Sequence, residues 1–207
     1  DLNNSEIGTY QNLADYLKNG YWENRGTVSR KFNLSDTGVN PKDGTITYNV
    51  TGNDFDANGI SEARAYLVDE AFKLLEVVMG IDFEKTSDGE ADIRFGDFNS
   101  GAYAQTGAGS YGSGLSYVNV NISSNWESGI SGFGNYTFQT ILHEIGHALG
   151  LGHQGNYNNW ASYPSDADFT NDNWQSSIMS YFSPSENTTI DADFNWVSTF
   201  MPADWIA

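Results

Sequence analysis

Three histidines stand within one short stretch, TILHEIGHALGLGHQGNY at residues 140–157, and they are the only histidines of the 207-residue chain. His143 and His147 are four residues apart, so on a helix they project from one face, one turn from each other. Two neutral imidazoles at this spacing can bind one metal ion, and His153 offers a third nitrogen. Catalytic zinc takes three such protein ligands and a water molecule. The spacing therefore predicts a catalytic zinc site.

Two further residues of the stretch fit this chemistry. Glu144 lies beside the metal without being needed as a ligand, so it can accept a proton from a bound water molecule. A helix that continued straight would carry His153 away, and Gly150 can supply the break because glycine adopts positive φ. The complete pattern, H-E-x-x-H-x-x-G-x-x-H, is a catalytic motif of zinc peptidases. A closed structural zinc site would instead have a fourth protein ligand and no use for Glu144.

Helical periodicity indicates the elements that must position these residues. Helices are predicted at residues 5–19, 61–79 and 136–150, and the first turn of another at 202–207. The second begins at Ser61, a favourable N-cap, and Gly80 stops it. Asn19 and Gly20 are expected to end the first helix. The third helix carries His143 and His147.

Alternating and apolar runs predict the strands, at residues 44–50, 81–86, 91–98, 102–105 and 115–122. The order of strand, helix, several strands and helix predicts an α/β (α+β) fold with two long helices. Beyond Gly152 the sequence is rich in loop-forming residues. We therefore expect one catalytic domain over residues 1–207, with an upper lobe at about 1–150 and a smaller, irregular lower lobe at about 151–207.

Charge and composition exclude several classes of function. The formal net charge is −18, from 27 acidic and nine basic residues, which argues against nucleic acid or an anionic membrane as a partner. No apolar run is long enough for a transmembrane helix. The chain has no cysteine, so it has neither disulfides nor thiolate ligands. Residues 54–59, DFDANG, copy half of a calcium-binding loop; a turn leading to Ser61 is favoured, with a partial calcium site as the alternative.

Together with Met179 in the run SIMSYF, the zinc motif resembles that of the metzincin metalloproteases, in which a methionine of a tight Met-turn lies beneath the histidines. Tyr181, two places later, is typical of serralysins and astacins. The resemblance implies that Tyr181 is a fifth zinc ligand, which moves away when substrate binds and then helps to stabilise the oxyanion. Astacins usually place Glu after the third histidine and carry disulfides, whereas this chain has Gln154. Matrixin-type proteases lack the tyrosine.

The serralysin type is therefore favoured, and the run HQGNY at 153–157 resembles the serralysin H-P-G-x-Y. The similarity extends from about Tyr48 to Tyr181. It implies a mixed, mostly parallel twisted sheet and a substrate cleft along the strand edge formed by Gly101, Ala102, Tyr103, Ala104 and Gln105. Phe182 and the residues after it, to Ser185, would form the pocket wall. The glycine- and aspartate-rich repeat of the serralysin calcium-binding β-roll does not occur in this sequence, so we expect a catalytic domain without that module.

The resemblance further implies a secreted, monomeric zinc endopeptidase that acts on proteins or peptides and is inhibited by a small protein entering the cleft. Another metzincin branch, astacin-like or matrixin-like, is the first alternative. A protease-derived binding module without catalytic activity is the second. Glu144 and the three histidines are intact, which argues against the second alternative.

Overall fold

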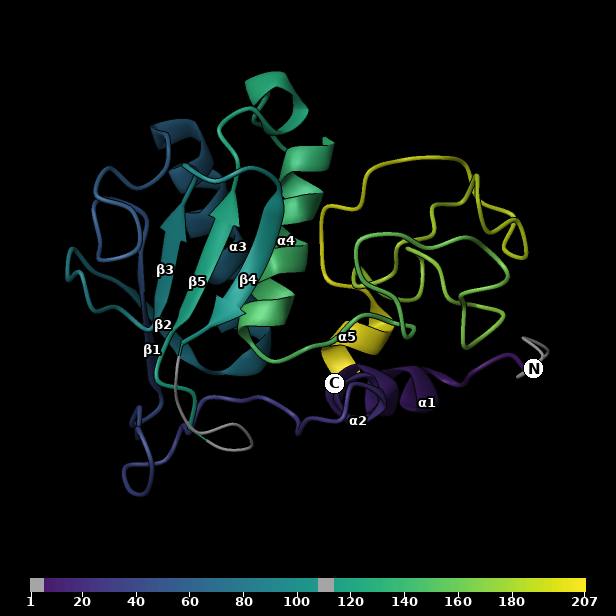
Figure 1. Cartoon of the computed structure of the whole chain (residues 1–207), viewed down its shortest axis with the longest axis horizontal. Helices are drawn as coiled ribbons and strands as arrows, with labels where there is room; N and C mark the ends of the chain where they lie inside the picture. The colour runs from purple at the N-terminus through teal and green to yellow at the C-terminus, as the bar shows by residue number, and fades with distance from the viewer. Residues whose placement is uncertain (1–5, 108–113) are drawn as a thin grey trace. The chain divides into compact units, whose positions relative to one another are not determined.

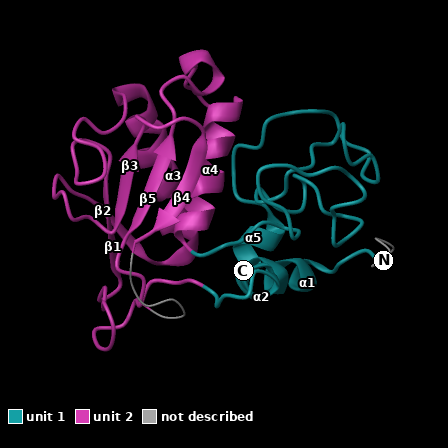
Figure 2. Cartoon of the chain, in the orientation of Figure 1, with its two compact units in different colours: residues 1–29, 150–207 teal, residues 30–149 magenta. Residues whose placement is uncertain are grey.

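The computed structural model describes residues 6–107 and 114–207. It contains two compact units, shown in separate colours in Figure 2. Unit 1 comprises residues 1–29 and 150–207, and unit 2 comprises residues 30–149. We expected the N-terminal segment to be part of the upper lobe, at about residues 1–150, together with the sheet. It is instead part of the same unit as residues 150–207.

Unit 2 is built on a five-stranded sheet with the order β2-β1-β3-β5-β4 (Figure 1). Its strands are β1 (Thr45–Asn49), β2 (Asp82–Lys85), β3 (Ile93–Gly96), β4 (Ala102–Thr106) and β5 (Val118–Ile122). β1 pairs in parallel with β2 and β3, and β3 pairs in parallel with β5. Only β4 is antiparallel to its neighbour, β5, and it forms one edge of the sheet. The predicted α/β fold with a mostly parallel sheet is confirmed.

The helix α3 (Glu62–Met79) packs on this sheet through a cluster of aromatic rings. The Ser61 hydroxyl accepts a hydrogen bond from the backbone N–H of Arg64, and Gly80 ends the helix with φ at 64°. Phe72 is 1% exposed, and its ring lies 4.3 Å from that of Tyr48 and 4.8 Å from that of Phe83, measured between centroids. Both predicted boundary residues therefore have the expected roles, and burial of the apolar helix face anchors α3.

The helix α4 (Tyr136–Ala148) contacts α3, β4 and β5, so the two long helices cover the same face of the sheet. Its N-cap is Asn135, whose side-chain oxygen accepts a hydrogen bond from the N–H of Phe138 at 3.1 Å. Most of its residues are buried, including Ile141, Leu142 and Ile145. This apolar packing makes α4 a rigid support for side chains near its C-terminal end.

The connection between β5 and α4 is held by Arg64, a buried guanidinium on α3. It donates hydrogen bonds to four backbone carbonyls, those of Ile122, Ser123, Ser124 and Trp126, at 2.7–3.4 Å. Desolvation lowers the pKa of Arg64, and the carbonyls compensate for part of the lost hydration. The guanidinium thereby fixes the segment that leads into α4.

In unit 1, the N-terminal helix continues beyond the predicted end at Gly20. Its segments are α1 (Tyr10–Asp15), a π-helical turn η1 (Tyr16–Gly20) and α2 (Tyr21–Asn24). Gly20 has helical torsions, φ −57° and ψ −41°, and the added turn buries the rings of Tyr21 and Trp22. Aromatic burial here outweighs the low helix propensity of glycine.

The remainder of unit 1 is mostly irregular, apart from the short helix α5 (Pro202–Ile206), which contacts α1. Its core includes Tyr157, Ala167 and Phe182, which are at most 7% exposed. A smaller core with little regular structure agrees with the loop-rich composition of this segment.

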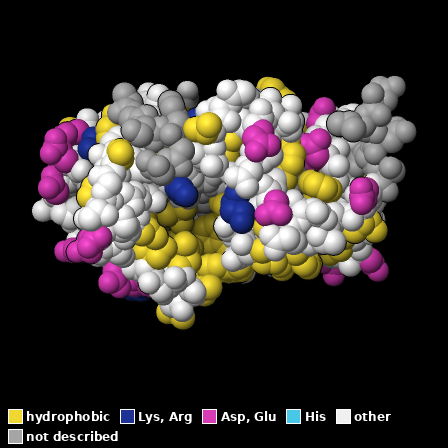
Figure 3. Space-filling view, turned by 90° about the horizontal axis from the view of Figure 1, so that it is seen from below, with side chains coloured by type: hydrophobic (Ala, Val, Ile, Leu, Met, Phe, Trp, Pro, Cys, Tyr) yellow, Lys and Arg dark blue, Asp and Glu magenta, His cyan; other side chains and the backbone are white. Residues whose placement is uncertain are grey.

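Acidic side chains are scattered over the face drawn in Figure 3, with few basic ones among them. This distribution matches the net charge of −18. Among the described residues, no helix is both long and apolar enough to span a membrane.

Candidate metal centre

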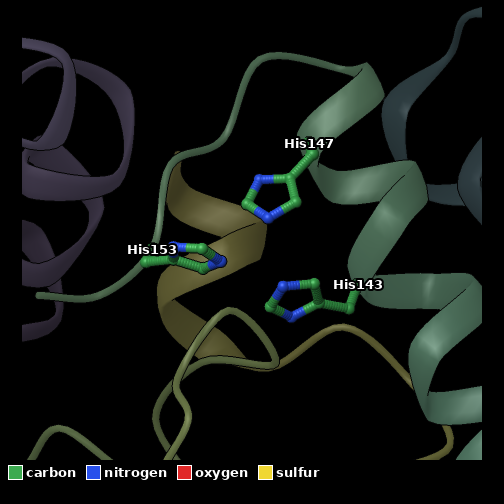
Figure 4. Close-up of side chains that lie close together, drawn as sticks. All are labelled: His143, His147 and His153. Carbon is green, nitrogen blue, oxygen red and sulfur yellow. The ribbon is translucent and has the colours of Figure 1, made fainter. Parts of the chain in front are cut away.

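The three histidines lie together. His143 and His147 extend from the C-terminal half of α4, His153 follows on the loop, and their rings face a common space (Figure 4). One ligand nitrogen of each lies within 4.8 Å of those of the other two. Zinc bonds to imidazole nitrogen at about 2.0–2.1 Å, so three nitrogens this close can share one ion. Within residues 6–107 and 114–207 this is the one such group of three or more His, Cys, Asp or Glu side chains.

The loop after α4 brings His153 into place through two glycines. Gly150 has φ +111°, in the range that residues other than glycine rarely adopt, and its carbonyl accepts a hydrogen bond from Nε1 of Trp22 at 2.9 Å. The N–H of Gly152 donates to the carbonyl of Leu17 at 2.8 Å. A Cβ atom at Gly152 would lie 2.2 Å from the ring of Tyr21. The N-terminal helix thus fixes the course of the loop.

His153 is 3% exposed and its ring orientation is determined by its neighbours. Its Nδ1 lies 2.8 Å from the carbonyl oxygen of Tyr157. Because a carbonyl only accepts, Nδ1 carries the proton and Nε2 presents the lone pair that a metal needs. The ring also stacks on Tyr157 at 5.6 Å and contacts the ring of Tyr181 edge-on at 4.6 Å.

Glu144 is a buried carboxyl next to the first histidine, 5% exposed. Burial raises its pKa from 4.5 to about 8. Its Oε2 atom is buried and has no hydrogen-bond partner among the described residues, which in a folded protein calls for a ligand or water molecule. A cation beside it would favour the ionised form and oppose the effect of burial. The residues present therefore fit a zinc ion with an attendant water molecule.

Tyr157 connects the third histidine to the segment that contains Tyr181. Its hydroxyl donates to the carboxylate of Asp172 at 3.1 Å and accepts a hydrogen bond from the backbone N–H of Tyr181 at 3.2 Å. Burial raises the pKa of Asp172 from 3.8 to about 7. Sequence reasoning used Tyr157 only as part of a motif and did not predict this role. The available sequence signal was the position of Tyr157 four residues after His153, close enough in the chain for the two residues to contact each other.

Met179 is fully buried in a tight turn that α5 stabilises. Its backbone N–H donates to the hydroxyl of Ser177 at 3.0 Å, and that hydroxyl donates to Asp204 at 2.6 Å. The other carboxylate oxygen of Asp204 accepts from the N–H groups of Ile178 and Met201, both at 2.8 Å. Sequence reasoning did not identify Asp204, because it lies 25 residues after the methionine.

The predicted cleft residues fall into two structural settings. Gly101 precedes β4, and residues 102–105 lie in that edge strand, whose side chains are mostly half-buried. Phe182 is 1% exposed, and its ring packs against those of Tyr157 and Tyr163 in the core of unit 1. Among the described residues β4 is thus the last strand of the sheet, whereas the ring of Phe182 is a core side chain.

The loop at residues 54–59 forms a turn in which the carboxylate of Asp56 accepts hydrogen bonds from backbone N–H groups. Asp56 accepts hydrogen bonds from the N–H of Asn58 at 3.2 Å and from the N–H of Asp97 at 2.9 Å. It is 5% exposed. This arrangement accounts for the DFDANG sequence as a turn, and calcium binding there stays a prediction.

Comparison with known families gives one extended match. Residues 39–161 match the peptidase family described as matrixin. The match includes β1–β5, α4 and all three histidines, and it ends before Met179 and Tyr181.

Individual relatives share a smaller part of the chain. Serralysin C of Dickeya chrysanthemi is 45% identical over 96 residues, which are 45% of this chain and 19% of that protein. Metallopeptidase AprA of Pseudomonas marginalis is 38% identical over 112 residues, 49% of this chain and 23% of the relative. A serralysin of Proteus mirabilis is 36% identical over 123 residues, which are 53% of this chain and 24% of that protein. The aligned part thus spans about a quarter or less of these relatives, and the matches confirm the predicted resemblance to the serralysin type.

Proposed function

This chain belongs to the peptidase family that is described as matrixin and matches residues 39–161, and its individual relatives include serralysins. On that premise we propose that it is a zinc-dependent endopeptidase that cuts extended proteins or peptides. The observation that carries the proposal is the convergence of His143, His147 and His153 next to the buried carboxyl of Glu144. Three neutral nitrogen ligands and an adjacent base are the minimum set for hydrolysis by a metal-activated water molecule.

Zinc bound to this trio would polarise the scissile carbonyl and lower the pKa of a coordinated water molecule to about 7. Glu144 accepts the proton of the water molecule that attacks the carbonyl carbon. As the C–N bond of the tetrahedral intermediate breaks, the same carboxyl delivers that proton to the leaving nitrogen, which departs as a neutral amine. The unpartnered Oε2 atom supports this role, since an attacking water molecule would supply its missing hydrogen bond.

Tyr181 has the second catalytic role in this proposal. By the family resemblance it is a fifth metal ligand before substrate binds, and afterwards its hydroxyl donates a hydrogen bond to the oxyanion. Its ring lies beside that of His153, with 4.6 Å between the centroids, which is consistent with both positions. By the same resemblance, Met179 is proposed to lie beneath the histidines.

Substrate is proposed to bind as an additional strand along β4. The other edge of β4 pairs with β5, so its outer backbone groups can pair with an extended peptide. Backbone pairing tolerates many sequences, which suits an enzyme that degrades proteins. Residues 101–105 would hold the peptide, and the segment that starts at Phe182 would contribute the pocket wall through groups other than its buried ring.

The remaining expectations follow from the family resemblance. We propose secretion, action as a monomeric catalytic domain over residues 1–207, and inhibition by a small protein that enters the cleft. The strongly acidic composition supports solubility at high concentration. Calcium is a second candidate ion, and binding measurements at the DFDANG loop would test it.

The decisive experiment is digestion of denatured casein and a peptide library by the zinc-loaded protein, with and without a chelator. We expect chelator-sensitive cleavage, and Glu144→Ala should retain zinc but lose about 10²–10⁴-fold in kcat. Glu84→Ala, at an exposed position of β2, is the matched control and should cleave normally. Peptide binding without cleavage by the unaltered, zinc-loaded protein would support a non-catalytic binding module instead.

A further inference from the structure

A turn at residues 158–160 follows the metal-binding loop. Asn158 and Trp160 form an isolated antiparallel bridge, which places Asn159 at the tip. Asn159 has φ +76°, in the left-handed region. Trp160 is 90% exposed, so packing of its ring does not explain the shape of the turn. The backbone of Asn159 is held in a sparsely populated conformation at the surface of unit 1.

This conformation directs the backbone N–H of Asn159 at the hydroxyl of Tyr181. The nitrogen lies 3.4 Å from the hydroxyl oxygen, with the N–H as donor. The ring of Tyr181 is located independently, by contacts with Tyr157 at 4.7 Å and His153 at 4.6 Å between centroids. The two rings therefore fix the body of the Tyr181 side chain, and the N–H of Asn159 contacts its reactive end.

A left-handed residue other than glycine costs about 1 kcal/mol or more, and such residues concentrate where function needs a particular backbone direction. Asparagine is among the residues that tolerate this region best. The hydrogen bond from the Asn159 N–H to Tyr181 gives this turn a polar contact that depends directly on the left-handed conformation.

We propose that Asn159 is a positioning residue for Tyr181, a role that rests on the proposed catalytic function of that tyrosine. A phenol has one O–H to donate and lone pairs to accept. The N–H of Asn159 occupies an acceptor site of the phenol oxygen, and a phenol that accepts a hydrogen bond there becomes a stronger donor toward an oxyanion. The same N–H competes with a metal ion for the phenol oxygen. The turn thus biases Tyr181 toward donating a hydrogen bond and away from binding metal.

The test uses two substitutions at one position. Asn159→Gly keeps both the N–H and the left-handed backbone, whereas Asn159→Val disfavours positive φ strongly because valine is β-branched. We expect Asn159→Val to lower kcat roughly two- to tenfold, the value of one hydrogen bond, with little change in KM. Asn159→Gly should retain the kcat of the unaltered protein. In a Tyr181→Phe background neither substitution should lower kcat further.

Two measurements do not depend on turnover. In the copper(II)-loaded protein, a tyrosinate-to-copper absorption band should be stronger with Asn159→Val than with Asn159→Gly, and absent with Tyr181→Phe. In the metal-free protein, the Asn159 amide should exchange its hydrogen faster once Tyr181→Phe removes the acceptor. This measurement leaves the sequence of the turn at residues 158–160 unchanged.

Equal losses of kcat from Asn159→Val in the unaltered protein and in the Tyr181→Phe variant would mean that the turn is merely structural, and would overturn the inference. Unchanged exchange of the Asn159 amide in Tyr181→Phe would do so as well. If the unaltered protein cleaves nothing, the proposed function fails, while the copper spectra and amide exchange still decide whether Asn159 positions Tyr181.

Discussion

The carbonyl oxygen of Tyr157 accepts a hydrogen bond from Nδ1 of His153, 2.8 Å away. The same residue donates through its hydroxyl to the buried Asp172 and accepts from the N–H of Tyr181. One side chain and its own backbone therefore connect the third metal ligand with the second proposed catalytic residue. Outer-shell contacts of this kind set the orientation and basicity of a ligand.

Tyr157→Phe should weaken this connection without creating a large cavity. The buried carboxyl of Asp172 and the N–H of Tyr181 each lose a partner, so we expect the free energy of unfolding to fall by about 1–3 kcal/mol. Zinc affinity, measured by competition with a chelator, should fall roughly tenfold. Tyr163→Phe is the control, since its hydroxyl donates to the carbonyl of Thr170. An equal loss of zinc affinity in the control would contradict a specific role for Tyr157.

Gly150→Ala should separate the third histidine from the other two. Its φ of +111° is unfavourable for alanine, and we expect a loss of about 1–3 kcal/mol in stability together with weaker zinc binding. Gly44→Ala imposes similar backbone strain at φ +79°, with no atom within 4 Å of the added Cβ. That control should lose stability but bind zinc normally. Chemical denaturation and isothermal titration with zinc distinguish the two outcomes.

Removal of zinc should lower the melting temperature. A ligand that binds only the folded state stabilises it by about 2.7 kcal/mol at a free concentration of 100 times Kd. Glu144→Ala should show the full stabilisation by zinc, and His147→Ala little of it. Differential scanning calorimetry over a series of zinc concentrations provides the comparison. A melting temperature of the unaltered protein that is independent of zinc would contradict binding at the histidines.

The carboxyl of Asp204 should make stability depend on pH. Burial raises its pKa from 3.8 to about 6, so the folded state binds this proton more tightly than the unfolded state. The stabilisation is complete below pH 3.8 and is lost as the pH rises through 6, up to about 3 kcal/mol at 1.36 kcal/mol per pH unit. Asp204→Asn should abolish this decline. The difference in unfolding free energy, variant minus unaltered protein, should therefore increase between about pH 4 and pH 7, and a constant difference would refute the assignment.

The sequence was most informative where a single local rule decides the structure. The spacing of His143 and His147 predicts one helix face, Ser61 and Gly80 define the ends of α3, and the alternating runs identify five strands. The family resemblance added the mostly parallel pairing. These features depend on neighbours a few residues apart, which periodicity and capping describe directly.

The sequence was least informative where distant segments meet. The predicted helix end at Gly20 was wrong because burial of Tyr21 and Trp22 favours another turn. The bonds from Asp204 to the Met179 turn, and from Asn159 to Tyr181, span more than twenty residues of irregular chain. Such contacts follow from the packed fold, and no local pattern in a single sequence reports them.

The bond between Leu17 and Gly152 joins residues that are far apart in the chain, and Asp204 holds the Met179 turn from near the end of the described sequence. During synthesis, the histidines of α4 leave the ribosome about sixty residues before this carboxylate does. Closing such long loops is slow and depends on contacts made late. The turn that holds Met179 is therefore completed only after the segment carrying Asp204 has been translated, well after the histidine motif.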